Sequence, residues 1–329
     1  MMHSARAVVV LALATGVTAF HLPARALAPR GWAIKGHSSR NLAMSVADAV
    51  GSAEGVAVDE SGALPKIVLS SGGAEAELYT LGACVTSYKV NGHNALFVRP
   101  DAKLDGSKPI SGGLPHCFPQ FGPGEMQQHG FARNLEWSVD SVKGGAAPSV
   151  TLKLADSDAT TAMWPHPFVC LYTVSLLEGK LSTELEVTNT GGSSFSFQAA
   201  LHSYFSCSDI NKVSIKSAGF AGAEYLNKMK DPPAKETLAG SEVTISQETD
   251  SVFFGVSGDV DVDDAGNGKR LTVSNKAGWE DTVVWNPYGN EAMGADNFLC
   301  VESALVGNPA SLEPGAKWVG KMDLLPGTA

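Results

Sequence analysis

Apolar and polar residues alternate along most of the chain. In LSTELEV, residues 181–187, leucine, valine and one threonine occupy every second position, with serine and glutamate between them. A period of two is typical of a β-strand that buries one face. Gly179 in EGK, just before this run, predicts a hairpin to the apolar run that precedes it.

Comparable runs recur from about residue 64 to the C-terminus, separated by turn residues. The clearest are PKIVLSS, SVTLKLA, SFSFQAALHSYFS, DTVVWN, FLCVESA and KWVGKMDLL. No run shows a sustained helical period, and no repeat of fixed length occurs. Many short strands without crossover helices predict an antiparallel all-β fold with few short helices, in a sandwich or a barrel. Because no linker-like break interrupts them, residues 51–329 are predicted to form one domain.

The first 50 residues differ from the rest. Arg6 precedes the apolar run AVVVLALATGVTAF, which has the length of a signal peptide and is too short to span a membrane. Small residues before Phe20 predict a signal peptide over residues 1–19. Residues 20–50 are basic and almost free of acids, like a plastid transit peptide or a disordered segment. The leader resembles the bipartite presequences of algae with extra plastid membranes, so we expect a plastid location, with secreted or cytoplasmic as alternatives.

The chain is acidic, with a formal net charge of -10. Residues 1–50 hold five Lys or Arg and one acid, so the remainder has 19 basic and 33 acidic residues, a formal charge of -14. Such a surface repels nucleic acids and anionic membranes, so we expect neither as a partner. An anionic substrate would need a local basic pocket.

Five cysteines are scattered singly, at positions 84, 117, 170, 207 and 300. The odd number and the absence of a CxxC pair argue against a disulfide framework or a zinc cluster. We expect buried thiols in a reducing compartment.

His202 is a candidate for proton transfer. It ends the alternating run SFSFQAALH and is followed closely by Tyr204 and Phe205. Aromatic faces pack on sugar rings, and imidazole moves protons near neutral pH. A core histidine bonded to the backbone would show the same pattern, so both interpretations stay open.

Glu302 lies within the apolar run NFLCVESALV. A carboxylate in such a run is costly unless it is paired or used, and burial would raise its pKa toward the range of a general base. The alternative is a structural glutamate bonded to backbone or to an arginine.

Other polar residues carry weaker signals. His93, in a turn, and His166, between two prolines, are typical of structural or surface positions. Asp250 and Asp281 precede apolar runs, where an acid usually belongs to a turn.

Metal binding is not supported by residue spacing. A cupin-like site would use His116, Cys117, His129 and Glu302. No His-x-His or His-x-x-x-His pair is present in the chain beyond position 50. We therefore expect no metal and no other cofactor.

Five motifs carry a family resemblance: SGGLPHCFPQFGPGEMQQHGFARNLEWSV, ALHSYFSCSDI, DTVVWNPY, CVESA and LEPGAKWVGKMDL. In this order they resemble the glucose-6-phosphate 1-epimerase branch of the aldose 1-epimerase (galactose mutarotase-like) family, especially plant members described as apospory-associated protein C. The resemblance extends from about residue 64 to 325. It implies a large antiparallel β-sandwich whose concave face binds a sugar.

The same resemblance implies roles for individual residues. His202 matches the catalytic acid of the family and Glu302 its catalytic base. Substrate would be bound by Gln128, His129 and Arg133 of QHGFAR, and by Asp250, with Arg133 at the phosphate. Within the same long motif, Phe131 and Trp137 are expected to pack rather than bind.

Two positions depart from the family pattern. Many members have an arginine before Gly-Gly where this chain has Ser111, and others have one after the later aspartate where it has Ser251. Each arginine–phosphate contact contributes roughly 1.5 to 3 kcal/mol. Lys103 and Lys108 in DAKLDGSKPISGG are candidates to compensate.

The expected reaction is interconversion of the α and β anomers of glucose 6-phosphate by acid–base ring opening and closure. The alternatives are an aldose 1-epimerase acting on unphosphorylated sugars and a non-catalytic carbohydrate-binding protein. We expect a monomer whose partner is a small sugar phosphate.

Overall fold

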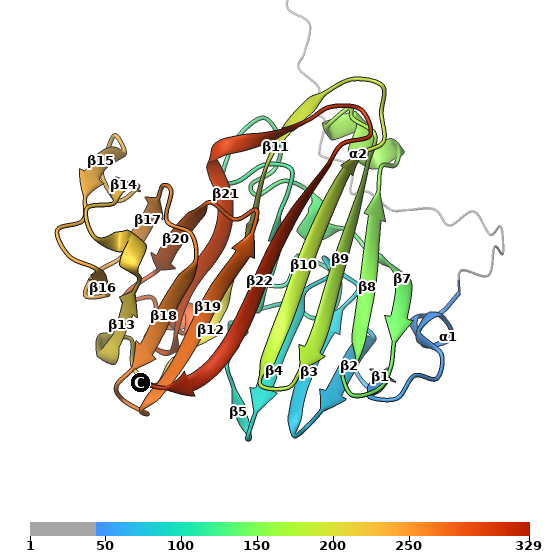
Figure 1. Cartoon of the computed structure of the whole chain (residues 1–329), viewed down its shortest axis with the longest axis horizontal. Helices are drawn as coiled ribbons and strands as arrows, with labels where there is room; N and C mark the ends of the chain where they lie inside the picture. The colour runs from blue at the N-terminus through green and yellow to red at the C-terminus, as the bar shows by residue number, and fades with distance from the viewer. Residues whose placement is uncertain (1–43) are drawn as a thin grey trace, which may run out of the picture. The chain divides into compact units, whose positions relative to one another are not determined.

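The computed structural model describes residues 44–329, which form one compact unit. The predicted signal peptide and most of the transit-peptide-like segment lie outside the described residues. The unit consists mainly of β-strands in three sheets, and all pairings between its named strands are antiparallel (Figure 1). The predicted all-β antiparallel sandwich with few short helices is confirmed.

The largest sheet has nine strands, four of which, β22, β10, β9 and β8, lie side by side as long ribbons in Figure 1. In sheet order, the strands are β16 (Glu242–Thr244), β13 (Val213–Lys216), β18 (Asp259–Asp264), β19 (Lys269–Ala277), β22 (Lys317–Thr328), β10 (Lys180–Asn189), β9 (Phe168–Leu177), β8 (Ser149–Ala155) and β7 (Ser138–Lys143).

The second sheet has eight strands and carries most of the residues of interest. In sheet order, they are β15 (Ala234–Thr237), β14 (Glu224–Asn227), β17 (Thr249–Phe253), β20 (Asp281–Asn286), β21 (Phe298–Leu312), β11 (Phe195–Leu201) and β6 (His116–Cys117), with β12 (Tyr204–Ser206) also paired to β21.

A five-stranded sheet and short helices complete the unit. The strands are β1 (Val56–Asp59), β2 (Lys66–Ser71), β3 (Ala74–Tyr79), β4 (Val85–Val90) and β5 (His93–Asn94). The helices are α1 (Val46–Val50), α2 (Asp158–Met163) and the 3-10 turns η1 (Ala132–Asn134), η2 (Ile210–Lys212), η3 (Ala218–Phe220), η4 (Glu291–Met293) and η5 (Ala295–Asn297). Within residues 44–329, no helix has the length and apolarity to cross a bilayer.

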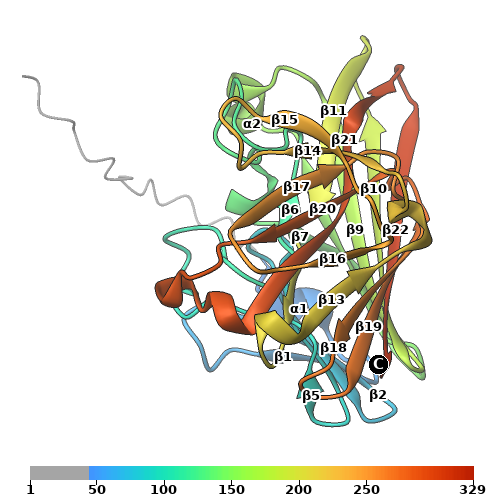
Figure 2. The same cartoon turned by 90° about the vertical axis from the view of Figure 1, so that its left-hand side faces the viewer.

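The main core forms where the sheets face each other. Alternate residues of β9 and β10 are buried along their whole length, and Figure 2 shows β10 and β22 in one layer with β17 and β20 in another. Leu181 and Val301, from opposite layers, belong to the same buried cluster. Burying one such side chain contributes about 1.5 to 3 kcal/mol, so the period-two pattern holds each strand in register.

The compact unit begins upstream of the domain start expected at residue 51. Ser45 caps α1 by accepting a hydrogen bond from the backbone N–H of Asp48. Val50, at the end of this helix, is 5% exposed and packs in the main core. Because Val50 packs in the main core, α1 is part of the domain.

Side chains expected in the interior are found there. All five cysteines are buried and free. Phe131 and Trp137 are 0% and 3% exposed, so both residues pack as expected from the QHGFAR region.

Gly112 and Gly113 allow three chain segments to approach closely. A Cβ atom at Gly112 would overlap the Cα atom of Val98, and one at Gly113 would overlap the carbonyl oxygen of Val85. Gly113 also has a φ of 70°, in the left-handed region that favours glycine. The glycine pair in SGGLP therefore has a packing role that draws residue 111 toward residues 97–99.

We expect Gly113→Ala to lower the free energy of unfolding more than Gly179→Ala does. Gly179 has a similar φ of 76° but open space around its Cβ position, so it is a matched control. The control should lose about 1 to 2 kcal/mol from backbone strain, and overpacking should cost Gly113→Ala a further 1 to 3 kcal/mol or so. Urea unfolding measures both, and equal losses would contradict the packing role.

Candidate active site

The register of the eight-stranded sheet sets one row of side chains against the main core and the next toward a cleft. Glu302 of β21 lies opposite Val283 of β20, and Asp250 of β17 lies opposite Trp285. Residues directly opposite each other share a face of the sheet. Glu302, Asp250 and Trp285 therefore project from the face away from the main core, while Val301, next to Glu302, packs in that core.

His202 and Glu302 form a close pair at the floor of this cleft. His202 follows β11, and its backbone N–H donates to the carbonyl oxygen of Pro115 at 2.9 Å. Its Nδ1 atom lies 3.5 Å from Oε1 of Glu302. Neither this Nδ1 atom nor Oε2 of Glu302 has a hydrogen-bond partner within the described residues. The glutamate is in a strand, as the sequence predicted, and its carboxylate lies beside the imidazole.

Aromatic rings fix the orientation of His202. Its ring stacks on Tyr204 with centroids 4.9 Å apart and 15° between the planes. Trp285 and His129 meet it edge-on, with centroid distances of 5.6 and 5.4 Å. A side chain held on three sides loses little freedom when a substrate binds.

Burial shifts the pKa values of the pair in opposite directions. It raises the pKa of Glu302 well above the usual value of 4.5, with a further contribution from the Asp250 carboxylate. It lowers the pKa of His202 well below 6.5, helped by His129, Arg133 and Lys228. Both shifts favour the neutral form of each group, because burial penalises the charged forms.

The loop between residues 119 and 131 delivers the second histidine. Gly130 is required here, because a Cβ atom would overlap the carbonyl oxygen of Phe118. His129, just before it, has a φ of 67°, which is unusual for a residue other than glycine. The buried ring of Phe131 anchors the end of the loop, so the strained histidine is held over the cleft.

The contacts of His129 define which ring nitrogen carries its proton. Its Nδ1 atom accepts from the backbone N–H of Gly122 at 3.2 Å and lies 3.1 Å from the thiol of Cys117. An accepting Nδ1 leaves the proton on Nε2. The Nε2 atom of Gln128 lies 3.3 Å from it, and since two N–H groups cannot bond each other, the amide oxygen of Gln128 belongs at this position. His129 can therefore offer an N–H donor beside His202.

Two cations lie on the loop side of the cleft. Arg133 donates from Nη2 to the carbonyl oxygen of Gln128 at 2.9 Å, and its buried Nε has no partner within residues 44–329. Lys228 forms an ion pair with Asp250 at 2.8 Å and lies over the ring of Phe121 at 5.5 Å. Nothing in the sequence marks Lys228 as a cleft residue, because its partner lies 22 positions further along the chain.

Arg99 is a third cation of the cleft, and it is not among the candidates predicted from the sequence. It lines the cleft beside Ser111, whereas neither Lys103 nor Lys108 does. Both lysines are exposed, and their compensation for Ser111 stays a prediction. The sequence contains one indication of this role, because Arg99 is a basic residue at the end of an apolar run, just before Pro100.

The second departure, Ser251, lies on the other face of β17. It is 7% exposed and lines a separate hollow with Tyr225 and Phe253. Because neighbouring strand residues point to opposite faces, Ser251 and the cleft residue Asp250 cannot share a ligand directly.

The cleft is large enough for a sugar phosphate. Its volume is about 420 Å³, within the range of small-molecule sites. The six residues singled out from the sequence all line it: Gln128, His129, Arg133, His202, Asp250 and Glu302. The fold therefore brings together positions that are up to 174 residues apart, 128 to 302.

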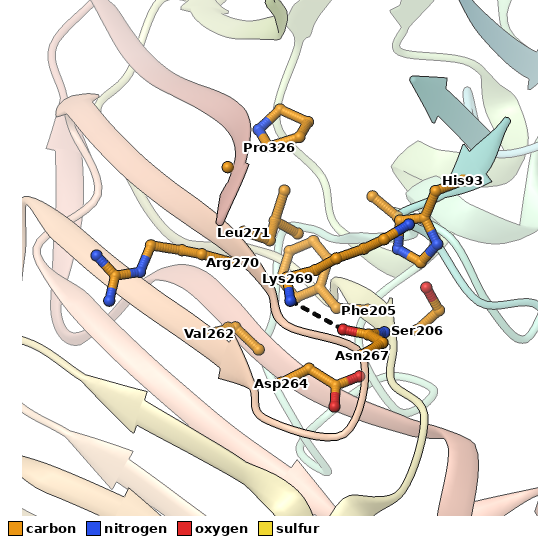
Figure 3. A pocket seen from close by; sticks show the side chains of 12 residues that line it. His93, Phe205, Ser206, Val262, Asp264, Asn267, Lys269, Arg270, Leu271 and Pro326 are labelled. Atoms are coloured by element: carbon orange, nitrogen blue, oxygen red, sulfur yellow. Dashed lines mark hydrogen bonds between the residues drawn. The ribbon is translucent and has the colours of Figure 1, made fainter. Parts of the chain in front are cut away.

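A second hollow lies between β5, β12 and the β18–β19 hairpin, beside His93 and Phe205 (Figure 3). The hydrogen bond drawn there runs from the backbone N–H of Lys269 to the side chain of Asn267, within the hairpin turn. The hollow measures about 40 Å³. One water needs about 10 to 15 Å³ on this measure, so the hollow suits a few waters rather than a hexose.

Other titratable residues have structural roles. Asp281 is 3% exposed and accepts from the backbone N–H groups of Gly255, Val306 and Gly307, which satisfies its carboxylate. His116 packs between Trp137 and Tyr172, and burial lowers its pKa to about 3. In the part of the chain that the structure describes, no group of three or more His, Cys, Asp or Glu side chains could hold a metal ion.

The fold and the cleft together define a class of protein. An antiparallel sandwich presents, on one open face, aromatic rings, hydrogen-bonding side chains and a buried His–Glu pair. Aromatic rings beside polar groups suit a sugar ring, and the pair suits proton transfer.

Comparison with known proteins agrees with this class. Residues 65–325 match the aldose 1-epimerase family, so the chain belongs to that family. It is 36% identical to a Cenchrus ciliaris protein provisionally named glucose-6-phosphate 1-epimerase, over 76% of this chain and 80% of that protein. An Escherichia coli protein with the same provisional name is 30% identical, over 73% of this chain and 83% of its own length.

A solved structure shows the same arrangement. A Salmonella typhimurium protein provisionally described as a mutarotase superposes with a TM-score of 0.75 at 25% identity. The match covers 83% of this chain and 94% of that one. The mutarotase-like β-sandwich is therefore shared across the family-matched region.

We expect His129 to stay neutral, with its proton on Nε2, from about pH 4 upward. Burial, with Arg133 and Lys228 nearby, lowers its pKa to about 3, so protonation occurs only below that value. Nitrogen-15 NMR of labelled histidine distinguishes the two ring nitrogens. Titration of this ring near pH 6.5, or a proton on Nδ1, would contradict the assigned contacts.

Proposed function

We propose that the protein interconverts the α and β anomers of glucose 6-phosphate. The observation that carries the proposal is the pair of His202 and Glu302 in a cleft lined by three cations. Nδ1 of His202, whose side chain is 12% exposed, lies 3.5 Å from Oε1 of the buried Glu302. Ring opening needs one proton removed from the hydroxyl on C1 and one added to the ring oxygen. A pair that shares one proton supplies both transfers.

In this mechanism Glu302 takes the proton from the anomeric hydroxyl while His202 gives one to the ring oxygen. The C1–O5 bond breaks and an aldehyde forms. Rotation about C1–C2 presents the other face of the carbonyl, and the reversed transfers close the ring to the other anomer. Each positioned group typically contributes about 10² to 10⁴ in rate.

The environment of the pair favours the opening step. Before opening, the pair is the ion pair of imidazolium and carboxylate; afterwards it is neutral imidazole and carboxylic acid. Burial raises the pKa of Glu302 and lowers that of His202, so it stabilises the neutral products of the transfer. The proton count of the pair does not change through the cycle.

The remaining cleft residues suit the rest of the substrate. Trp285 offers an aromatic ring beside the pair. Asp250, held by Lys228, and the N–H groups of His129 and Gln128 suit sugar hydroxyls. Arg133, which lines the cleft and spends one of its five N–H donors on Gln128, suits the phosphate, because guanidinium groups bind phosphate oxygens with strong charge-assisted bonds.

We expect Glu302→Gln to lower kcat about 10² to 10⁴-fold, because an amide cannot accept the proton. Glu313→Gln, on the exposed surface, is the matched control and should keep the wild-type rate. Anomer exchange measured by NMR provides the readout. A wild-type rate for Glu302→Gln would remove its role as base.

The pH profile of kcat should be bell-shaped, because activity needs one proton on the pair. A second proton binds His202, whose lowered pKa puts the acid limb well below 6.5. The single proton leaves Glu302, whose raised pKa puts the alkaline limb well above 4.5. An acid limb near 6.5 would contradict the burial of His202.

The choice of substrate is tested by comparing glucose 6-phosphate, galactose 6-phosphate and glucose in the same exchange experiment. We expect glucose 6-phosphate to have the highest kcat/KM, and added salt to weaken this preference because ions screen the cations of the cleft. Faster exchange of glucose would favour an epimerase of unphosphorylated sugars. No exchange with any sugar would indicate binding alone.

A further inference from the structure

We propose that Arg99 is a second phosphate-binding residue of the cleft and sets its preference for a phosphorylated sugar. The proposal rests on the proposed function, because it names a residue that would recognise the phosphate of that substrate. It starts from the pairing of two short segments at the rim of the cleft.

Arg99 and Ser111 lie directly opposite each other. Val98 and Gly112 form an antiparallel bridge. Beside it, the N–H of Arg99 donates to the carbonyl oxygen of Ser111 at 3.0 Å, and that of Gly113 donates to Phe97 at 2.8 Å. Opposite residues of an antiparallel pair share a face, with Cβ atoms about 4.5 to 5.5 Å apart. The side chain of a cation at position 99 therefore projects from the same part of the cleft as one at position 111 would.

The backbone at Arg99 is well defined. Pro100 restricts the residue before it to extended conformations. On the other side, Gly112 has a φ of 142°, and a side chain there would overlap Val98. The side chain of Arg99 therefore projects from a restricted stretch of backbone, and it is only 14% exposed.

The guanidinium of Arg99 has donors to spare. Asp101 accepts from its Nε at 2.9 Å and from its Nη2 at 2.6 Å. Arginine has five N–H donors, so Asp101 and the neighbouring Tyr204 hydroxyl leave two for an anion. The bidentate contact with Asp101 orients the guanidinium, and the Asp101 side chain itself is 50% exposed. A phosphate dianion can therefore bind the remaining donors.

The other two cations of the cleft also have partners. Lys228 is paired with Asp250, and Arg133 already holds the carbonyl oxygen of Gln128. A phosphate bound by Arg133 alone would sit in a domain whose residues 51–329 have a formal charge of -14. Arg99 adds positive charge where Ser111 has none, which favours anion binding in this acidic protein.

The test compares wild-type protein with Arg99→Ser in the anomer exchange of glucose 6-phosphate and of glucose. We expect KM for glucose 6-phosphate to rise about ten- to hundred-fold, as loss of one charged phosphate contact predicts. The rate with glucose should not change. Thermal unfolding of each variant shows that it is folded.

The double variant Arg99→Ser with Ser111→Arg tests whether the position of the charge, rather than Arg99 itself, sets the affinity for the phosphate. Because the two positions face each other, an arginine at 111 should restore most of the affinity for glucose 6-phosphate. Lys143→Ser removes one charge from β7, in the other large sheet, and should leave KM unchanged. It controls for the net charge of the protein.

The outcomes separate the two proposals. A wild-type preference for glucose 6-phosphate that survives Arg99→Ser would overturn the role of Arg99 and leave the proposed function standing. An equal rise of KM for both sugars would also overturn it, since the change would then affect the whole cleft. Wild-type protein that does not prefer the phosphorylated sugar would overturn both.

Discussion

The pairing of β21 with β20 on one side and β11 on the other is the constraint on which the rest of the structure depends. Antiparallel hydrogen bonds place Val301 in the main core and Glu302 in the cleft. A slip of one residue would exchange them, burying a carboxylate among aliphatic side chains and exposing a valine. The same ladder sets Trp285 and Asp250 on the cleft face and brings His202, just beyond β11, next to Glu302.

Loops complete what the sheet begins, and close backbone contacts hold them. Gly112 and Gly113 let residues 111–114 lie between two other segments, and Gly130 lets the following loop cross residue 118. Pro115 and Gly113 in turn accept backbone hydrogen bonds from His202 and Tyr204. These glycines are therefore sites of close backbone contact rather than flexible turns. The contacts position His129, Arg133 and Arg99, which lie outside the regular strands.

Burial gives the cleft its chemical character. Water would stabilise both ions of a His–Glu pair and leave their pKa values near ordinary ones. Against the sheet, with Tyr204 stacked on the imidazole, the neutral form of each group is favoured. Within residues 44–329, Nδ1 of His202 and Oε2 of Glu302 have no hydrogen-bond partner, and such a cost in stability is typical of residues retained for function.

The sequence by itself determined the fold class and the chemical candidates. Its period-two runs require strands with one buried face, and a glutamate among leucine and valine is conspicuous because an unused carboxylate there would be costly. It did not reveal Lys228 or Arg99. For the positive charge that is missing at Ser111, it offered Lys103 and Lys108, which are close to that position along the chain. Only the tertiary structure decided which charges meet, because cross-strand pairing places residue 99 opposite residue 111 and residue 228 beside residue 250, and sequence distance does not encode that pairing.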